Sequence, residues 1–319
     1  MIHHAWAADP DNREHEWGVI LAGGDGTRLK SLTRQIAGDE RPKQFCPVLG
    51  KGTLLEETEK RATLQLARER TLYVVNRLHE QYYAPILADL PANNLVIQPA
   101  NRGTAPAILY SLLRIVAVDP DALAAFFPSD HYVSDNNTFM AHVRTALNTA
   151  RNRRDLVLLL GVDPESPEVE YGWIEPAEPL SGQPRVFRVR RFWEKPSQLL
   201  AQVLQLRGCL WNSFVMVARA QALLGVIESA IPGLYDRFGS HFDLFGTRAE
   251  AKVIDEVYKR LEVINFSHQV LAQRHERLAV IRVTGVRWND LGEPKRVMAS
   301  LNIAGIRPHW ADARVAQYA

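Results

Sequence analysis

The sequence predicts an α/β protein with a doubly wound, mostly parallel mixed sheet, and three observations support this. As far as residue 161, short apolar runs typical of strands alternate with longer segments of helical periodicity. Strands separated by helices form parallel β-α-β units, which pack helices on both faces of a sheet. The first run, Trp17–Ile20, leads directly into a glycine-rich loop, an arrangement that brings backbone amides close to a phosphate.

The first half of the chain supplies most of the expected strands and the helices between them. Strands are expected at Trp17–Ile20, Thr71–Val75, Leu95–Gln98, Ala122–Phe127 and Leu156–Gly161. Helices are expected after Thr53, around His79–Ala88, at Thr104–Val118 and at Thr138–Ala150. Thr53 offers the side-chain oxygen that a helix N-cap needs, and Pro106 falls in a first helical turn, where proline is tolerated.

From about residue 165 the pattern changes, because prolines divide the chain into shorter pieces. A small strand-rich lobe laid over the sheet is expected at about 165–195, with strands at Tyr171–Glu175 and Val186–Phe192. A surface loop is expected at Pro232–Phe245. The remaining expected elements are helix Gln198–Leu206, strand Leu210–Val217, helix Gln221–Ala230, helices near Ala249–Tyr258 and His268–Gln273, strand Leu278–Val283 and helix Pro294–Leu301.

Length and composition indicate a globular chain with one main domain. The 319 residues are 46% hydrophobic and 23% charged, with a net charge of +2. This balance gives no electrostatic footprint for nucleic acid or an anionic membrane. One domain is expected at 17–300. It is preceded by a flexible polar tail at 1–16, which contains His3 and His4, and followed by a C-terminal tail at 301–319, to which the sequence assigns no role.

Three features of the sequence favour a cytoplasmic protein. No apolar run approaches the length of a membrane span. Residues 1–16 lack the basic start and apolar segment of a secretory signal. The two cysteines, Cys46 and Cys209, have no metal-ligand spacing, and a chain of this size needs no disulfide, which favours a reducing compartment.

The stretch Leu21–Phe45 carries the clearest chemical signal. It is not the phosphate loop of nucleoside triphosphatases, because Gly26 is followed by Thr-Arg instead of Lys-Ser/Thr. It is not the dinucleotide fingerprint, because Leu29 stands where a third glycine is required. Judged by its glycines alone, the stretch could also be an ordinary flexible turn. A triphosphate site is favoured by three cations on the same connection: Arg28, Arg41 and Lys43.

This stretch resembles the signature of sugar-1-phosphate nucleotidylyltransferases, G-G-x-G-T-R-L…P-K, and Pro42–Phe45 is most similar to the mannose-1-phosphate guanylyltransferase branch. The resemblance covers roughly residues 17–300. It implies a Rossmann-like sheet of the nucleotide-diphospho-sugar transferase type. It also implies that Arg28 and the glycine amides hold the β- and γ-phosphates, while Lys43 acts at the transferring phosphorus. The implied nucleotide-binding residues are Leu21, Ala22, Gly23, Gly24, Gly26, Thr27, Arg28, Lys43, Gln98, Gly103, Thr104 and Ala105.

Two aspartates are implied as ligands of Mg²⁺. Asp130 follows a strand, at the edge where open α/β sheets bind ligands, in a segment similar to the family's L-P-A-D-H. Asp290 stands in a segment that resembles W-x-D-x-G. Carboxylates suit Mg²⁺, whereas His131 is not expected to bind it, because imidazole suits softer metals. Judged from the residues alone, two alternative interpretations remain: Asp130 could be a helix cap or a turn residue, and Asp290 could belong to a turn at the end of a strand.

The segment Gln98–Ala107 resembles the part of the family that edges the nucleobase. Gln98 offers both a donor and an acceptor, as base recognition requires. The branch usually has asparagine where this chain has Gly103, and glutamate is common where it has Gln98. Both departures weaken a prediction of guanine.

On the sugar side, Tyr171 and Gly172 resemble the family's G-Y-G-Y-I, and Asn212 matches L-W-N-S. Glu194 and Lys195 match F-x-E-K-P. The resemblance implies that Glu194 accepts hydrogen bonds from sugar hydroxyls, Lys195 holds the sugar phosphate and Asn212 contacts the sugar. Without the other motifs, the Glu-Lys pair before proline would be an exposed strand end.

Two departures fall on this side. Glu170 stands where the family commonly has glycine, and Phe214 stands where it has glycine, which predicts a tighter pocket floor. The loop between Leu29 and Pro42 is also a few residues longer than the branch usually has. No left-handed β-helix or isomerase domain follows, so only the transferase module is expected.

The resemblance implies nucleotidyl transfer from GTP to mannose 1-phosphate, giving GDP-mannose and pyrophosphate, with Mg²⁺ as cofactor. Arg28, Lys43, Asp130 and Asp290 are the implied catalytic residues. The expected partners are these small molecules, with no nucleic acid or membrane, and a homodimer is left open. Two alternatives remain: the same reaction with glucose 1-phosphate or another triphosphate, and a catalytically weak regulatory homologue that binds nucleotide sugar.

Overall fold

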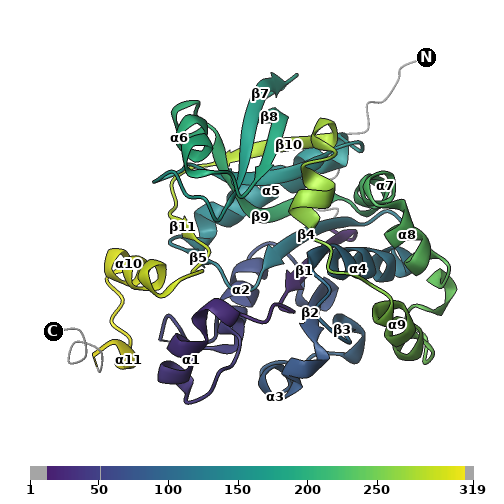
Figure 1. Cartoon of the computed structure of the whole chain (residues 1–319). Coiled ribbons are helices and arrows are strands. Elements are labelled where there is room, and N and C mark those ends of the chain that lie inside the picture. Colours follow the sequence, from purple (N-terminus) through teal and green to yellow (C-terminus); the bar gives the residue numbers. More distant parts are fainter. Residues whose placement is uncertain (1–12, 51, 313–319) are drawn as a thin grey trace.

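The computed structural model describes residues 13–50 and 52–312, which are arranged around a large mixed sheet (Figure 1). Its strand order is β3-β2-β1-β4-β9-β6-β10-β8-β7, and a separate ribbon pairs β5 with β11. The strands are β1 Glu16–Leu21, β2 Thr71–Asn76, β3 Leu95–Gln98, β4 Leu123–Pro128, β5 Tyr132–Val133, β6 Val157–Val162, β7 Gly172–Leu180, β8 Gln183–Glu194, β9 Leu210–Arg219, β10 Leu278–Val283 and β11 Trp288–Asn289.

The predicted doubly wound, mostly parallel mixed sheet is confirmed. Strand β1 pairs in parallel with β2 and β4, β2 with β3, and β6 with β10. Strand β9 runs antiparallel between β4 and β6. The helices are α1 Lys30–Ala37, α2 Leu54–Ala62, α3 Glu80–Tyr83, α4 Thr104–Val118, α5 Asn136–Asn152, α6 Gln198–Leu206, α7 Ala220–Ala230, α8 Pro232–Gly239, α9 Glu250–Lys259, α10 Pro294–Ala304 and α11 His309–Asp312.

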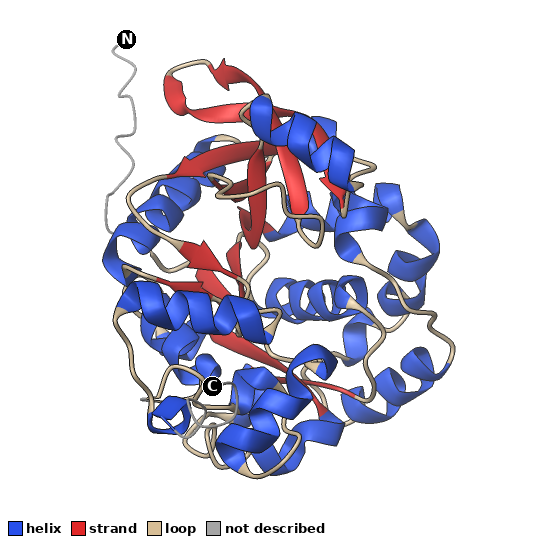
Figure 2. Cartoon of the chain, turned by 60° about the vertical axis from the view of Figure 1, so that its left-hand side comes forward, coloured by secondary structure: helices blue, strands red, loops and turns tan. Residues whose placement is uncertain are grey.

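Helices cover both faces of the sheet (Figure 2). Helices α4, α7, α8 and α9 pack on one face, and α2, α5 and α6 pack on the other. Successive strand residues face opposite sides, so Phe126 of β4 joins the first core and Phe127 the second. Because both faces are covered, these strands are apolar without alternation. Full burial of each such side chain contributes about 1.5–3 kcal/mol.

A third apolar cluster holds α10 against α1 and the residue before it. Leu29 and Leu32, before and within α1, pack with Val297 and Leu301 of α10. Leu291, which follows β11, belongs to the same cluster. Helix α10 is thereby fixed beside the glycine-rich loop that leaves β1.

Some predicted elements differ from the structure. The surface loop expected at Pro232–Phe245 is wrong, because it contains α8, whose Leu234 and Phe238 are buried against the first core. Pro232 begins that helix, where its missing N–H is no disadvantage. The helix expected around His79–Ala88 is shorter, since α3 covers only Glu80–Tyr83. The N-cap at Thr53 is confirmed and forms a complete capping box with Glu56.

The strand-rich lobe does not lie over the sheet as expected but extends its edge. Strand β8 pairs with β10, and β7 pairs with both β8 and β9. Prolines are tolerated there because an edge strand does not need every N–H in the ladder. The expected domain limits stay predictions, and described secondary structure continues as far as Asp312. Residues 1–12, with His3 and His4, and 313–319 of the predicted tails lie outside the described residues.

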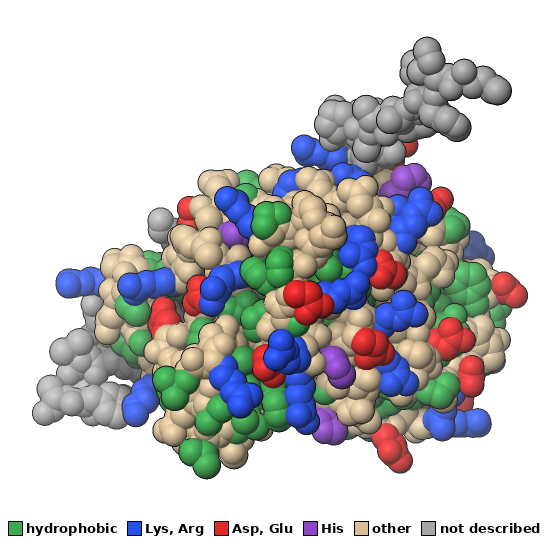
Figure 3. Space-filling model, turned by 90° about the horizontal axis from the view of Figure 1, so that it is seen from above, with side chains coloured by type: hydrophobic (Ala, Val, Ile, Leu, Met, Phe, Trp, Pro, Cys, Tyr) green, Lys and Arg blue, Asp and Glu red, His purple; other side chains and the backbone are tan. Residues whose placement is uncertain are grey.

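Basic and acidic side chains are interspersed over the face of the molecule seen in Figure 3. Within the described residues, no helix combines the length and apolar character that a membrane span requires.

Candidate active site

A cleft of about 510 Å³ opens where β1, β3 and β4 end, the edge at which α/β sheets bind ligands. It brings together residues predicted from distant segments of the chain. Those that line it are Leu21, Gly23, Gly24, Gln98, Gly103, Thr104, Asp130, Tyr171, Gly172, Glu194, Asn212 and Asp290. The predicted residues outside this lining are Ala22, Gly26, Thr27, Arg28, Lys43, Ala105 and Lys195.

The side chain of Gln44 holds the backbone of the glycine-rich loop in place. The Gln44 carboxamide donates hydrogen bonds to the carbonyl of Ala22 at 3.0 Å and to that of Gly24 at 2.7 Å. Its side chain is buried, and buried carbonyls are expensive to leave without a donor. Sequence reasoning included Gln44 in a family segment but assigned it no role. Arg41, expected to face the phosphates, is instead held by a two-point contact with Asp39.

Lys43 connects the two predicted metal ligands. Its ammonium lies 3.3 Å from Oδ2 of Asp130 and donates to the backbone carbonyls of Asp290 and Leu291. The β5–β11 ribbon explains this meeting, because Asn289 pairs with Tyr132 and so places the two aspartates at the same end. The carboxylate of Asp130 and the backbone of Asp290, far apart in the sequence, therefore meet at one buried cation.

Charges around Asp290 keep it ionised. Burial alone would raise the pKa of Asp290, but Lys43 and Arg296 outweigh it, and the pKa lies below its usual value. Oδ1 of Asp290 accepts hydrogen bonds from the Tyr171 hydroxyl at 3.0 Å and from the Gly292 N–H at 2.8 Å. Burial lowers the pKa of neighbouring His131 to about 4, so its imidazole is neutral at pH 7.

On the base side, the departure at Gly103 has a steric cause. Gly103 has φ of +82°, and a Cβ on it would lie 2.3 Å from the carbonyl oxygen of Ile264. The N–H of Ile264 donates a hydrogen bond to the carbonyl of Arg102, and its carbonyl accepts one from the N–H of Ala105. The backbone of Ile264 therefore cannot move away from Gly103. Only glycine fits against this segment. The segment adds Val263, Asn265 and Ser267 to the cleft lining, and sequence reasoning did not identify them.

Gln98 is buried at the same end of the cleft. Its Oε1 accepts a hydrogen bond of 3.1 Å from the hydroxyl of Tyr258, which is also buried. This contact fixes the orientation of the carboxamide, whose Nε2 group is a hydrogen-bond donor that Tyr258 does not use.

On the sugar side, Gly172 makes room between two predicted ligands. A Cβ there would lie 3.1 Å from Oε2 of Glu194 and 3.3 Å from Cβ of Asn212. Burial raises the pKa of Glu194. The carboxamide oxygen of Asn212 accepts the Phe214 N–H at 3.1 Å, which turns the chain tightly, and Phe214 lines the cleft as expected.

Backbone strain is concentrated around this cleft. Among the described residues, three that are not glycine have positive φ: Lys195 at 47°, Phe214 at 61° and Leu291 at 49°. Each lies within two residues of a predicted ligand, namely Glu194, Asn212 or Asp290. Such conformations are held only where the surrounding structure determines them, and they gather at functional sites.

Glu170 joins the two ends of the cleft. One of its carboxylate oxygens lies 3.4 Å from Nη1 of Arg28 and 3.1 Å from Nζ of Lys195. The side chains of Arg28 and Lys195 are each 52% exposed. The cations predicted to bind the triphosphate and the sugar phosphate therefore share one carboxylate. Sequence reasoning noted Glu170 only as a departure.

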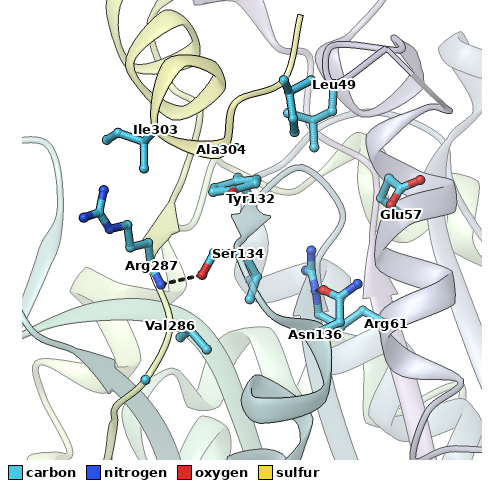
Figure 4. A pocket seen from close by; sticks show the side chains of 13 residues that line it. Leu49, Glu57, Arg61, Tyr132, Ser134, Asn136, Val286, Arg287, Ile303 and Ala304 are labelled. Carbon is cyan, nitrogen blue, oxygen red and sulfur yellow. Dashed lines mark hydrogen bonds between the residues drawn. The ribbon is translucent and has the colours of Figure 1, made fainter.

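A larger pocket of about 830 Å³ lies elsewhere, between α2, the β5–β11 ribbon and the end of α10 (Figure 4). Its buried Arg61 donates to Oδ1 of Asn136 at 2.7 Å and to the carbonyl of His131 at 3.3 Å. None of the predicted site residues lines it. The predicted chemical groups converge on the smaller cleft.

Comparisons with known proteins show the family of the chain. The family model "Nucleotidyl transferase" matches residues 17–302. Alginate biosynthesis protein AlgA of Pseudomonas aeruginosa is 32% identical over 280 residues, which cover 86% of this chain and 56% of that protein. Mannose-1-phosphate guanylyltransferase of Salmonella muenchen is 30% identical over 280 residues, covering 86% of this chain and 57% of that protein.

A solved structure is also similar. The crystal structure of mannose-1-phosphate geranyltransferase from Thermus thermophilus has a TM-score of 0.74 and 29% identity, and the match covers 87% of this chain and 76% of that one. The chain spans about half the length of the curated relatives it matches. The family model, by contrast, matches nearly the whole described chain. The chain belongs to the nucleotidyl transferase family.

Proposed function

We propose that this chain transfers a nucleotidyl group from GTP to mannose 1-phosphate, giving GDP-mannose and pyrophosphate. One observation carries the proposal: a single cleft joins the glycine-rich loop, two aspartates around Lys43, and the sugar-side residues. Relatives named for this reaction, for alginate and for xanthan biosynthesis support it, and they suggest that the product feeds polysaccharide synthesis.

Catalysis would depend on alignment and charge neutralisation. The acceptor phosphate is largely ionised at pH 7, since its second pKa is about 6, so no side-chain base is needed. Arg28 and the loop amides would hold the β- and γ-phosphates, and Lys43 would stabilise the transferring phosphorus. Lys195 would hold the acceptor phosphate in line for attack.

The two aspartates fit Mg²⁺. Asp130 and Asp290 line one cleft, where Lys43 contacts the carboxylate of Asp130 and the backbone carbonyl of Asp290. Mg²⁺ binds through one or two carboxylates, with phosphates and water completing its shell. Within the described chain, no group of three or more His, Cys, Asp or Glu is placed to hold a metal ion. Bound by the two aspartates, the ion would neutralise charge on the transferring phosphate.

The substrate preference rests on the two ends of the cleft. The Nε2 donor of Gln98 suits the O6 acceptor of guanine. At the other end, Glu194 and the amide group of Asn212 offer an acceptor and a donor to sugar hydroxyls. The buried free thiols of Cys46 and Cys209 support a reducing compartment such as the cytoplasm, and a homodimer remains a prediction.

The test is pyrophosphate release by purified protein with Mg²⁺ and a panel of nucleoside triphosphates, each paired with mannose 1-phosphate or glucose 1-phosphate. We expect the highest kcat/KM for GTP with mannose 1-phosphate. A higher value for another pair would correct the substrates but keep the reaction. Absence of release with every pair would overturn the proposal and favour a regulatory protein that binds nucleotide sugar.

A further inference from the structure

We infer that Glu170 is an internal competitor for the substrate phosphates, holding Arg28 and Lys195 until substrates displace it. The inference rests on the proposed function, which assigns those two cations to the triphosphate and to the sugar phosphate. It concerns substrate affinity and the coupling between the two substrates, and it adds no step to the reaction.

The first argument is geometric. The two cations come from separate parts of the chain, Arg28 from the turn after β1 and Lys195 from the end of β8. Both reach the same oxygen of Glu170, at 3.4 Å and 3.1 Å. A carboxylate oxygen between two cations resembles a phosphate oxygen in charge and in hydrogen-bonding capacity. The hydrogen bond from Lys195 is the main cause of the lowered pKa of Glu170, so the carboxylate is charged at pH 7.

The second argument concerns what can move. The N–H of Glu170 donates to Oε1 of Glu168 at 3.1 Å, and Oε2 of Glu168 lies 3.1 Å from Nη1 of Arg296. On the other side, the hydroxyl of Tyr171 donates to Asp290. The backbone at Glu170 is therefore fixed from both sides, whereas its side chain is 37% exposed. Displacement requires only rotation of that side chain into solvent.

The third argument is one of magnitude. Exposed ion pairs are weak, so each contact of Glu170 changes a binding constant by roughly 1.5- to fivefold. A triphosphate or a sugar phosphate carries more charge than one carboxylate and displaces it readily. Because one oxygen serves both cations, the first substrate to displace Glu170 also frees the cation that the second one needs. Each substrate should therefore favour binding of the other, and by the same factor.

The experiment compares wild type with Glu170→Gln, which removes the charge and keeps the shape. We expect the KM values of GTP and mannose 1-phosphate both to fall about two- to fivefold, with kcat within about twofold. Glu178→Gln removes the same charge from an exposed position on β7 and should leave both KM values unchanged. Unchanged or higher KM values in Glu170→Gln, with an active wild type, would overturn the inference.

Calorimetry with inorganic pyrophosphate gives a second readout that does not require turnover. Pyrophosphate should bind Glu170→Gln about two- to fivefold more tightly than wild type. Added mannose 1-phosphate, which cannot react with pyrophosphate, should tighten pyrophosphate binding more in wild type than in the variant. If wild type shows no turnover with any substrate pair, the proposed function fails, and this titration still decides the inference: equal or weaker binding by the variant overturns it.

A purely structural role for Glu170 would give a different pattern. It would lower the melting temperature of Glu170→Gln and leave pyrophosphate affinity unchanged. Glu170→Asp keeps the charge but shortens the side chain by one methylene, so we expect affinities between those of wild type and Glu170→Gln. Values equal to wild type, together with an effect in Glu170→Gln, would still support the charge as the cause.

Discussion

The two halves of the cleft are built differently. The nucleotide half depends on buried polar side chains that bond the backbone or each other, as Gln44, Lys43 and Gln98 do. The proposed sugar half stands at the sheet edge, where Glu170 precedes β7 and Lys195 follows β8, and both side chains are partly exposed. Under the proposed function, the residues assigned to the phosphates and the base are held by the core, while those assigned to the sugar can change with little disturbance of the fold.

The largest effect is expected where both halves meet. Asp130→Asn should lower kcat about 10²–10³-fold, because it weakens charge stabilisation at the transferring phosphate. Pyrophosphate release at saturating GTP and mannose 1-phosphate measures this. The melting temperature should stay near that of wild type, since asparagine can still accept from Lys43. A folded variant that keeps near-full turnover with Mg²⁺ would make the metal assignment wrong.

On the nucleotide half, Gln44→Ala should lower the free energy of unfolding by about 2 kcal/mol, because two loop carbonyls lose their buried donor. The loosened loop should raise the KM of GTP about tenfold and leave that of mannose 1-phosphate within about twofold. Urea titration and steady-state kinetics measure both. Gln202→Ala, at an exposed position on α6, is the matched control and should change neither. Equal rises in the two KM values would contradict the division into halves.

On the sugar half, Phe214→Gly should alter sugar choice more than stability. Glycine relieves the positive φ and removes a ring that packs against Phe266, so the two effects on stability oppose each other. Loss of the ring should reduce discrimination between mannose 1-phosphate and glucose 1-phosphate about tenfold in kcat/KM. The KM of GTP, measured in parallel, should not change. A large loss of stability with unaltered discrimination would mean that Phe214 is a core residue only.

The smallest effect concerns the two thiols, one near each half. Burial raises the pKa of Cys46 to about 12 and that of Cys209 to about 11, so both stay protonated and unreactive at pH 8. Because the thiol pKa values are higher in the folded state than in the unfolded state, they contribute stability at pH values below the unfolded thiol pKa of about 9. This contribution is lost as the pH rises through the pKa values of the folded state. In mild urea, Cys209 should be labelled first, because its neighbour Leu210 pairs with β7 of the β7–β8 hairpin, the edge part of the sheet. Labelling rates of two variants that each keep one cysteine measure which thiol is exposed first. Earlier labelling of Cys46 would mean that the nucleotide half opens before the sugar half.

Much of the fold could be predicted from the sequence, because strands buried on both faces are continuous apolar runs that periodicity detects. The loop expected at Pro232–Phe245 is wrong, since an aromatic and glycine-containing stretch indicates a loop, while tertiary packing of Leu234 and Phe238 makes it helical. The prediction that the β7–β8 hairpin lies over the sheet is wrong, because sequence periodicity does not show which strand edge accepts a partner strand.

The candidate site was predictable where motifs carry it, and not where a contact depends on folding. The motifs gave Asp130 and Lys43, which the structure places 3.3 Å apart. No local pattern indicates that Gln44 bonds the glycine-rich loop, or that Ile264 approaches Gly103 closely enough to exclude any other residue. The bridge at Glu170 likewise joins three segments that meet only in the folded chain.

The β5–β11 ribbon has a consequence for synthesis of the chain. Its second strand is made after every strand of the main sheet, and Asp290 follows it directly. A growing chain that has reached β10 can already complete the sheet and the glycine-rich loop, since domains fold as their segments emerge. It would still lack one of the two carboxylates around Lys43. Under the proposed function, metal-dependent turnover should therefore appear last during translation, when the ribbon closes.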